Sequence, residues 1–311
     1  MGAGNAGYAA AMPPEISAQA CAACGGHDLV PHLRVAGELG DAGLLPTTDQ
    51  FGTALGDIVR CTTCGHMQLR PLPAERDLDA AYGDAESADY VEEAAGQRET
   101  ARRVLGRLER HVAPGELLDV GAWIGYLVAE AGDRGWSAMG VEPSAFASAF
   151  ARERLGVDVR TGGLFDTELP AARFAAVTMG DVIEHFVRPE AALDRVGSLL
   201  APGGVLWLAL PDAGSRVART MGRRWWSVIP THVQYFTRGS VVQLLERSGF
   251  EVLDVRSSPK AFSVRYYLER VRGYSPRLAR LLVRGAERLG LADRMWAPDF
   301  RDRMAVIAAR R

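Results

Sequence analysis

The chain has 311 residues, of which 48% are hydrophobic and 24% charged, and its formal net charge is −2 at pH 7. That length accommodates one full α/β domain and a small accessory module. No apolar run approaches the ~18–20 residues of a membrane span. Residues 1–17 lack the basic start and apolar core of a signal peptide, so we expect a disordered tail at 1–17 and a cytoplasmic protein.

The charge is distributed unevenly along the chain. Residues 214–311 carry 19 arginines and one lysine against eight acidic residues, so the rest of the chain is acidic. A basic C-terminal third is compatible with a phosphorylated or otherwise anionic acceptor, and equally with solvated helix faces that bind nothing. The acidic remainder argues against extended binding to duplex nucleic acid, which needs a larger basic footprint.

All the cysteines fall in two matched Cys-x-x-Cys-Gly turns. Each turn aims two thiolates at one point, and its glycine permits the tight backbone that a closed tetrahedral zinc site requires. Redox-active or inert cysteines are the alternatives, but two copies of one turn favour structural zinc. His27 and His66 flank the turns and are interpreted as bystanders, because the cysteines complete the shell. The predicted ligands are Cys21, Cys24, Cys61 and Cys64.

The text after the second turn carries a family resemblance. Residues 65–73 contain an apolar pair and two prolines, and a polar stretch with Tyr82 and Tyr90 follows. This pattern resembles the zinc-knuckle leader found before many bacterial methyltransferases of sugar, polysaccharide and natural-product pathways. The resemblance implies a zinc-knuckle domain at 18–75 and a linker or helical segment at 76–98.

A nucleotide-binding half begins after a helix predicted near 99–111. A short apolar strand at 117–120 enters a glycine turn and then a helix, an arrangement that brings backbone and a helix N-terminus to a ligand. A second buried strand ends in Glu142, 23 residues after Asp119. That spacing suits a carboxylate that binds the ribose hydroxyls of an adenosine. A dinucleotide dehydrogenase would begin in the same way.

The second half of the domain separates these alternatives. A fourth strand at 174–182 runs into Glu184-His185, and a Leu-x-Pro-Gly-Gly turn at 200–204 leads into a fifth strand. Together with Asp-x-Gly-x-x-x-Gly and the acid after strand two, this order closely resembles class I S-adenosylmethionine (SAM) methyltransferases. Later motifs at 231–237 and 244–252 resemble the subgroup of ubiquinone-pathway O-methyltransferases.

The resemblance implies a Rossmann-like α/β fold for residues 99–311: a seven-stranded sheet whose last strand, at 302–308, is antiparallel. It also implies a SAM site in which the glycine turn surrounds the methionine moiety, an acid binds the ribose, two apolar residues flank adenine, and residues after strand four lie by the amino-acid end. Trp123 stands where the family usually has glycine, so its ring either covers the methionine end or turns aside. By this resemblance, Asp119, Gly121 and Gly125 surround the methionine moiety and Glu142 binds the ribose. Leu164 and Phe165 flank adenine, and Gly180 and Asp181 lie by the amino-acid end.

An alcohol acceptor must also lose a proton, and histidine titrates in the right range. His232 is predicted as the general base and His185 as a positioning group; a structural hydrogen bond for His185 and a surface position for His232 are the alternatives. A lid at 214–238 is predicted over the acceptor, or packed on its own domain. An insertion at 262–296 holds a basic amphipathic helix, 275–289, that caps the acceptor site or packs on a second subunit; binding to a membrane surface is a less favoured alternative. The predicted lid contacts are Arg223, Arg224, Trp225, Trp226 and Tyr235.

These predictions describe a SAM-dependent methyltransferase with structural Zn²⁺ that acts on a small molecule, with O-methylation of a sugar or natural-product hydroxyl favoured. A C-methyltransferase acting on a nucleotide-linked deoxysugar is the alternative within the enzyme class. A non-catalytic SAM-binding or scaffold protein is the alternative outside it. An RNA methyltransferase is disfavoured because no Asn/Asp-Pro-Pro-Tyr motif follows the fourth strand. We expect no nucleic-acid partner and no transmembrane segment, and a homodimer is compatible with the sequence.

Overall fold

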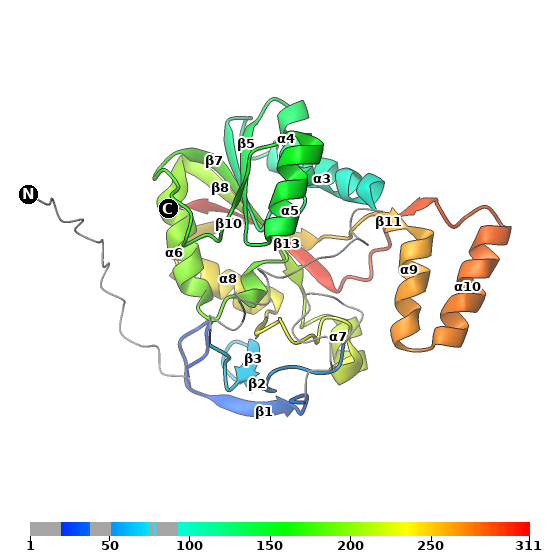
Figure 1. Cartoon of the computed structure of the whole chain (residues 1–311). Coiled ribbons are helices and arrows are strands. Elements are labelled where there is room, and N and C mark those ends of the chain that lie inside the picture. Colours follow the sequence, from blue (N-terminus) through cyan, green and yellow to red (C-terminus); the bar gives the residue numbers. More distant parts are fainter. Residues whose placement is uncertain (1–19, 38–50, 75–77, 79–92) are drawn as a thin grey trace, which may run out of the picture.

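The structure, a computed structural model, describes residues 20–37, 51–74, 78 and 93–311 (Figure 1). The predicted tail at 1–17, most of the predicted linker at 76–98, and Tyr82 and Tyr90 lie outside these described residues. Within them, no helix is long and apolar enough to cross a membrane.

A seven-stranded sheet forms the centre of the molecule, in the order β10-β13-β8-β7-β4-β5-β6. Strand β13 lies antiparallel between β8 and β10, whereas the pairs from β8 to β6 are parallel. The predicted fold class, with its antiparallel last strand, is therefore confirmed. The strands are β4 (Glu116–Val120), β5 (Ser137–Glu142), β6 (Val159–Thr161), β7 (Phe174–Gly180), β8 (Leu200–Pro211), β10 (Phe250–Ser257) and β13 (Arg303–Arg310).

Helices cover both faces of this sheet (Figure 1). Because successive side chains of a strand point to opposite faces, Leu117 packs with α3 and α4 whereas Leu118 packs with α6 and α8. The strands are consequently apolar on both sides, as buried parallel strands are. The elements on the faces and their connections are α3 (Ala94–Leu108), α4 (Tyr126–Asp133), α5 (Ala145–Phe150), η1 (Ala151–Leu155), η2 (Ile183–His185), α6 (Pro189–Leu199) and α8 (Arg238–Arg247).

Helix α3 begins at Ala94, earlier than the predicted 99. Its first turn is small and polar, so it carries no apolar periodicity by which to recognise it. A tertiary contact stabilises it instead: a Cβ on Gly96 would lie 2.3 Å from the carbonyl oxygen of Ala261. Only glycine permits that close approach of the helix to the chain after β10.

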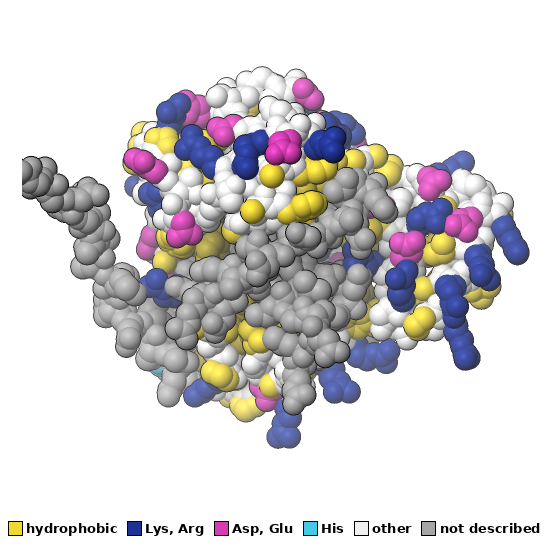
Figure 2. Space-filling view, in the orientation of Figure 1, with side chains coloured by type: hydrophobic (Ala, Val, Ile, Leu, Met, Phe, Trp, Pro, Cys, Tyr) yellow, Lys and Arg dark blue, Asp and Glu magenta, His cyan; other side chains and the backbone are white. Residues whose placement is uncertain are grey.

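The predicted insertion is a helical projection from the sheet domain (Figure 1). A short pair of antiparallel strands, β11 and β12, closes its base. The amphipathic helix is present, and its leucines are exposed, with Leu281 at 68% and Leu289 at 72%. Figure 2 shows arginine side chains gathered over this projection. Its elements are β11 (Phe262–Ser263), α9 (Val264–Arg270), η4 (Val271–Gly273), α10 (Pro276–Arg288) and β12 (Met295–Trp296).

The cysteine module is a small antiparallel sheet that takes one strand from the sheet domain. Its order is β1-β2-β3-β9, where β9 belongs to the predicted lid. One apolar cluster joins Ile58 and Leu69 of the module to Trp225 and Val233 of the lid. The module and the lid therefore share a core. Their elements are β1 (Leu29–Leu33), β2 (Asp57–Cys61), β3 (Met67–Arg70), α7 (Arg216–Met221), η3 (Gly222–Arg224) and β9 (Gln234–Tyr235).

Candidate active site

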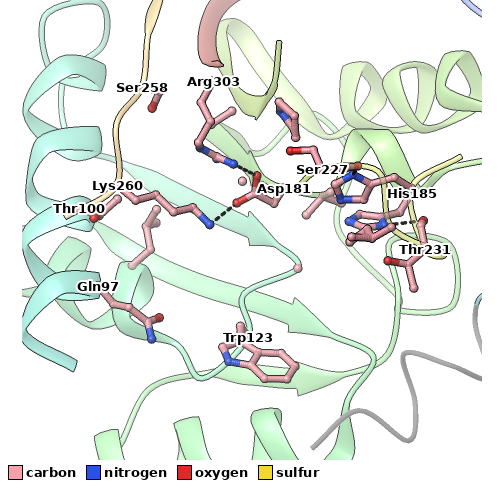
Figure 3. Close-up of a pocket in the computed structure, with 18 of the residues that line it drawn as sticks. Gln97, Thr100, Trp123, Asp181, His185, Ser227, Thr231, Ser258, Lys260 and Arg303 are labelled. Atoms are coloured by element: carbon pink, nitrogen blue, oxygen red, sulfur yellow. Dashed lines mark hydrogen bonds and ion pairs between the residues drawn. The ribbon is translucent and has the colours of Figure 1, made fainter. Parts of the chain in front are cut away.

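A cavity of about 1360 Å³ opens at the carboxyl ends of β4, β5 and β7. Ligand sites in α/β sheets lie at these strand ends. The volume exceeds the roughly 300–1,000 Å³ of a typical small-molecule site, so the cavity has room for two ligands. The glycine turn, the lid and the insertion all line this cavity, and Figure 3 shows Trp123 of the turn apart from Ser227 and Thr231 of the lid.

The glycine turn requires glycine at two of the predicted SAM positions. Gly121 and Gly125 have φ of 70° and 83°, in the left-handed region that favours glycine. A Cβ on Gly121 would also lie 2.5 Å from Cγ2 of Val182. Trp123 between them has φ of 48°, which explains why glycine suits that position. Its side chain lines the cavity (Figure 3).

Two buried carboxylates lie at the carboxyl ends of the adjacent strands β4 and β5. Asp119 accepts a hydrogen bond from Oγ1 of Thr178 at 2.6 Å, and burial raises its pKa to about 7. Glu142 accepts hydrogen bonds from the backbone N–H groups of Trp123 and Ser144, each at 2.9 Å. Burial raises the pKa of Glu142 as well. The glycine turn, the second strand and the helix after it are thus joined through Glu142.

The predicted adenine-binding pair also lines the cavity. Leu164 is buried, whereas Phe165 is 54% exposed and meets the ring of Phe186 edge-on at 6.0 Å between centroids. The side chain of Leu164 is therefore held in the core, whereas the ring of Phe165 is accessible.

Asp181 adopts a left-handed φ of 59° at the end of β7 and lies between two cations. Lys260 Nζ and Arg303 Nη1 each lie 2.5 Å from its carboxylate oxygens (Figure 3). Although burial acts to raise it, these cations hold the pKa of Asp181 well below its usual range. Sequence reasoning missed both cations. The signal for one of them was that Lys260 is the single lysine of an arginine-rich chain.

The two predicted catalytic histidines lie together, with ring centroids 4.7 Å apart. Nδ1 of His185 lies 2.8 Å from the carbonyl oxygen of Thr231, and Nδ1 of His232 lies 2.8 Å from that of Ser227. A carbonyl oxygen only accepts, so each Nδ1 donates, and the neutral ring of His232 keeps its lone pair on Nε2. Burial lowers the pKa of His185 to about 4 and that of His232 well below its ordinary value. Both rings are therefore neutral at pH 7.

A third titratable group, Glu184, adjoins this pair, and sequence reasoning assigned it no role. It is 1% exposed, and neither carboxylate oxygen has a hydrogen-bond partner among the described residues. Oε1 lies 4.0 Å from Nε2 of His232. Burial raises the pKa of Glu184 to about 8, so the acid is largely protonated at pH 7. Its only sequence signal was its place in the Glu-His pair after β7.

The structure corrects the predicted lid contacts. Only Trp226 of the five lines the cavity. Trp225 and Tyr235 are buried in the core that the lid shares with the module, because β9 pairs with β3. Arg223 and Arg224 are exposed outside the cavity. Sequence reasoning missed an aromatic wall formed largely by the insertion and its flank: Phe51, Tyr266, Tyr267, Tyr274, Trp296 and Phe300.

The four predicted zinc ligands converge at one point of the module. Their sulfurs all lie within 4.8 Å of one another, and the Cys21–Cys64 and Cys24–Cys61 pairs are each 3.6 Å apart. A tetrahedral zinc ion with Zn–S bonds of about 2.3 Å requires sulfur separations near ~3.8 Å. The backbone N–H of Gly26 donates to Cys24 Sγ at 3.4 Å. The donor set therefore fits zinc.

His27 is exposed beside this cluster, as a bystander would be. His66, in contrast, has a structural contact elsewhere in the fold. It is fully buried, and Nε2 lies 2.9 Å from Oε1 of Gln234 in β9.

A family model described as a methyltransferase domain matches residues 91–255. The chain belongs to this methyltransferase domain family. The matched region contains the glycine turn, Glu142, Asp181 and both histidines, and it confirms the resemblance to class I methyltransferases.

Several relatives show what the methyltransferase is similar to. A probable S-adenosylmethionine-dependent methyltransferase from Mycolicibacterium smegmatis is 30% identical over 155 residues, which are 49% of this chain and 58% of that protein's length. A SAM-dependent methyltransferase of Thermotoga maritima, a possible histamine N-methyltransferase, is 19% identical over 71% of this chain and 94% of its own, with a TM-score of 0.47. Magnesium protoporphyrin IX methyltransferase from Synechocystis is 14% identical over 76% and 92%, with a TM-score of 0.49.

Proposed function

We propose that the protein transfers the methyl group of SAM to a hydroxyl of a small-molecule acceptor, a sugar or a natural product. The observation that carries this proposal is the composition of one cavity. A glycine turn with two buried acids forms one end, and a pair of neutral histidines with fixed tautomers lies toward the other.

The SAM half of the cavity would be formed by the predicted residues. The carboxylate of Glu142 uses two acceptor positions for backbone N–H groups. A carboxylate has about four such positions, so two remain for the ribose hydroxyls. Leu164 and Phe165 offer apolar surfaces to adenine, and Asp119, Gly121 and Gly125 surround the methionine moiety.

The amino-acid end of SAM is a zwitterion, with an ammonium and a carboxylate. Asp181, beside Gly180, presents an anion flanked by the cations of Lys260 and Arg303. Both charges of a zwitterion would find a partner there. This supports placing the amino-acid end after β7, as the family resemblance implied.

The acceptor half combines an aromatic wall with the histidine pair. Tyr266 and Tyr267 come from α9, and Trp226 of the lid meets Phe300 edge-on at 6.2 Å between centroids. Flat aromatic faces bind planar rings and the apolar faces of sugars. A ring that bears the hydroxyl therefore fits this wall.

SAM supplies a methyl group on a positively charged sulfur, so the protein mainly has to align the acceptor and remove a proton. In the proposed reaction the acceptor oxygen forms a bond to the methyl carbon as the sulfur–carbon bond breaks. The hydroxyl proton goes to Nε2 of His232, whose lone pair is available because Nδ1 donates to Ser227. His185, against the same ring, positions the acceptor.

The experiment is to measure SAM binding by calorimetry and S-adenosylhomocysteine formation over a panel of hydroxylated sugars and aromatic natural products. His232→Gln should bind SAM as the wild type does and lose turnover about 10²–10⁴-fold, the usual contribution of a general base. His27→Gln, at an exposed histidine outside the cavity, is the matched control. Unchanged turnover in His232→Gln would refute its role as the base.

The product also separates the competing functions. With SAM labelled with ¹³C in the methyl group, NMR distinguishes a methyl bound to oxygen from one bound to carbon. A carbon-bound product, above all from a nucleotide-linked deoxysugar, would replace O-methylation by the C-methyltransferase alternative. Tight SAM binding without turnover on any acceptor would support the non-catalytic SAM-binding alternative.

A further inference from the structure

A chain of buried hydrogen bonds links the cysteine module to the loop that carries His185. His66 and Gln234 are 0% and 1% exposed. The amide oxygen of Gln234 can only accept, so Nε2 of His66 donates the bond of 2.9 Å between them. The amide nitrogen of Gln234 donates in turn to the carbonyl oxygens of Phe186 and Val187, each at 3.2 Å.

Backbone hydrogen bonds join the same segments. The N–H of Leu69 in β3 donates to the carbonyl oxygen of Val233 at 3.0 Å, and the N–H of Val233 donates to that of Glu184 at 3.0 Å. The segment that contains His232 is therefore held between the module on one side and the loop after β7 on the other.

On its other side, β3 is tied to both cysteine turns. The N–H of Cys61 donates to the carbonyl oxygen of His66 at 2.8 Å. The side chain of Gln68 accepts from the N–H of Ala22 at 2.8 Å and donates to the carbonyl oxygen of Ala20 at 3.0 Å. Gln68 is also the register partner of Gln234. Gln68 thus connects the first cysteine turn to β9.

The SAM half of the cavity is held together differently. The N–H of Gly121 donates to the carbonyl oxygen of Val141 at 2.9 Å, and Glu142 binds the turn from the same strand. These bonds run between β4, β5 and the turn, all within the central sheet. The glycine turn is therefore held by bonds from the central sheet, whereas the bonds that hold the histidine segments also involve the module.

We propose that the zinc module is the structural support of the acceptor half, and that His66 and Gln234 are positioning residues for the His185–His232 pair. Metal bound by the four thiolates would fix the two turns, and His66 and Gln234 carry that order to the histidines. Loss of the metal should then disturb the acceptor half and leave the SAM half intact. That this half of the cavity binds a methyl acceptor rests on the proposed function. The coupling of the module to the histidine segments does not depend on that function.

The first test uses variants that keep all four cysteines. His66→Leu removes the donor to Gln234, whereas His66→Gln keeps an N–H donor and serves as the conservative control. Hydrogen exchange should accelerate about tenfold at 183–187 and 231–236 in His66→Leu and stay near wild type at 117–125. S-adenosylhomocysteine should bind within about twofold of wild type by calorimetry. Gln234→Leu, which removes all three side-chain bonds, should repeat the pattern more strongly.

The second test removes the metal from the zinc-loaded protein with a chelator and follows the same peptides. We expect the pattern of His66→Leu, with S-adenosylhomocysteine binding retained. Unchanged exchange at 183–187 and 231–236, in both the metal-free protein and His66→Leu, would show that the module is an independent appendage. Equal acceleration at 117–125, or loss of S-adenosylhomocysteine binding, would show that it supports the whole domain, which also overturns the proposal. Neither readout needs turnover, so each is separate from a failure of the proposed reaction.

Discussion

Nε2 of His232 lies 4.0 Å from Oε1 of Glu184, a buried carboxyl group that has no hydrogen-bond partner among the described residues. Each group is shifted toward its neutral form by burial: the histidine loses its proton more readily, and the acid keeps its proton to a higher pH. At neutral pH the pair is therefore an uncharged base beside an uncharged acid. If His232 takes a proton from the acceptor, Glu184 can stabilise the resulting cation only after it has lost its own proton.

The first prediction concerns the pH profile of turnover. A base works in its deprotonated form, and the pKa of His185 is lowered to about 4 and that of His232 well below its usual value. At saturating SAM, kcat should therefore stay level from pH 7 down to pH 6, where an unperturbed histidine would already be largely protonated. Stopped assays across pH 4–9 measure this.

Saturating SAM is needed in that experiment because Asp119, with a pKa raised to about 7, titrates in the same range. Calorimetric SAM binding at each pH gives the separate contribution of the cofactor half. A fall in kcat centred near pH 6.5 would contradict the buried, neutral histidine pair.

The second prediction concerns stability. Since the folded-state pKa of Glu184 is raised to about 8, the folded protein holds a proton that the unfolded chain releases above the ordinary value near 4.5. Stability is then lost as pH rises between these two values, at up to about 1.4 kcal/mol per pH unit. Glu184→Gln abolishes that loss, so its melting temperature should fall less than that of the wild type between pH 5 and pH 8.

Glu251→Gln, at an exposed position of β10, is the matched control and should follow the wild type. If Glu184→Gln and the wild type lose the same stability over this range, Glu184 is ionised in the folded protein at neutral pH.

The third prediction concerns the cations around Asp181. Arg303→Met leaves the half-buried carboxylate of Asp181 with the more exposed Lys260, so the free energy of unfolding should fall by less than the about 3–5 kcal/mol that loss of one partner costs in a fully buried ion pair. Lys260→Met should cost less, because its side chain is 30% exposed and that of Arg303 is 19% exposed. Urea unfolding of the two variants at pH 7 compares them, and equal losses would contradict this order.

The same pair predicts an acid-sensitive contribution. The pKa of Asp181 is held well below its usual range, so its contribution to stability is present above about pH 3.9, the ordinary value, and is lost as pH falls below it. The difference between the wild type and Arg303→Met in urea should therefore shrink below pH 4. A difference that is constant from pH 7 to pH 3 would exclude the ion pair as its cause.

Local sequence signals predicted the sheet domain well because its motifs lie at strand ends. Glycines with positive φ and acids after buried strands mark the turn and the second strand, and the order of these motifs indicated the sheet. The sequence did not predict Lys260 and Arg303 as partners of Asp181, because they come from segments far along the chain and only the tertiary fold brings them to it.

The sequence also did not predict that the module and the lid pack together, for a similar reason. The pairing of β3 with β9 joins residues more than 160 positions apart, and β9 has only two residues. No periodicity identifies so short a strand. Its partner then decides which side chains are buried, which is why Trp225 and Tyr235 lie in a shared core and not over the cavity.

The fourth prediction uses this difference between two adjacent tryptophans. Trp225 is 3% exposed in the core shared by lid and module, so Trp225→Ala should lower the free energy of unfolding by about 3–5 kcal/mol, as large-to-small core substitutions do. Trp226 lines the cavity and meets Phe300 edge-on, so Trp226→Ala should cost less stability and instead raise the KM for the acceptor. Urea unfolding and steady-state kinetics on both variants separate the two effects.

S-adenosylhomocysteine binding should stay near wild type in Trp226→Ala, because Val141 and Glu142 of β5 hold the glycine turn. The reverse pattern, with Trp226→Ala unfolding more easily and Trp225→Ala raising KM, would require the buried ring of Trp225 and the partly buried ring of Trp226, which packs against the same cluster, to exchange places. The pairing of β3 with β9 opposes this, since it holds Tyr235 and Val233 beside Trp225 in one apolar cluster. We therefore expect the larger loss of stability in Trp225→Ala and the larger rise in KM for the acceptor in Trp226→Ala.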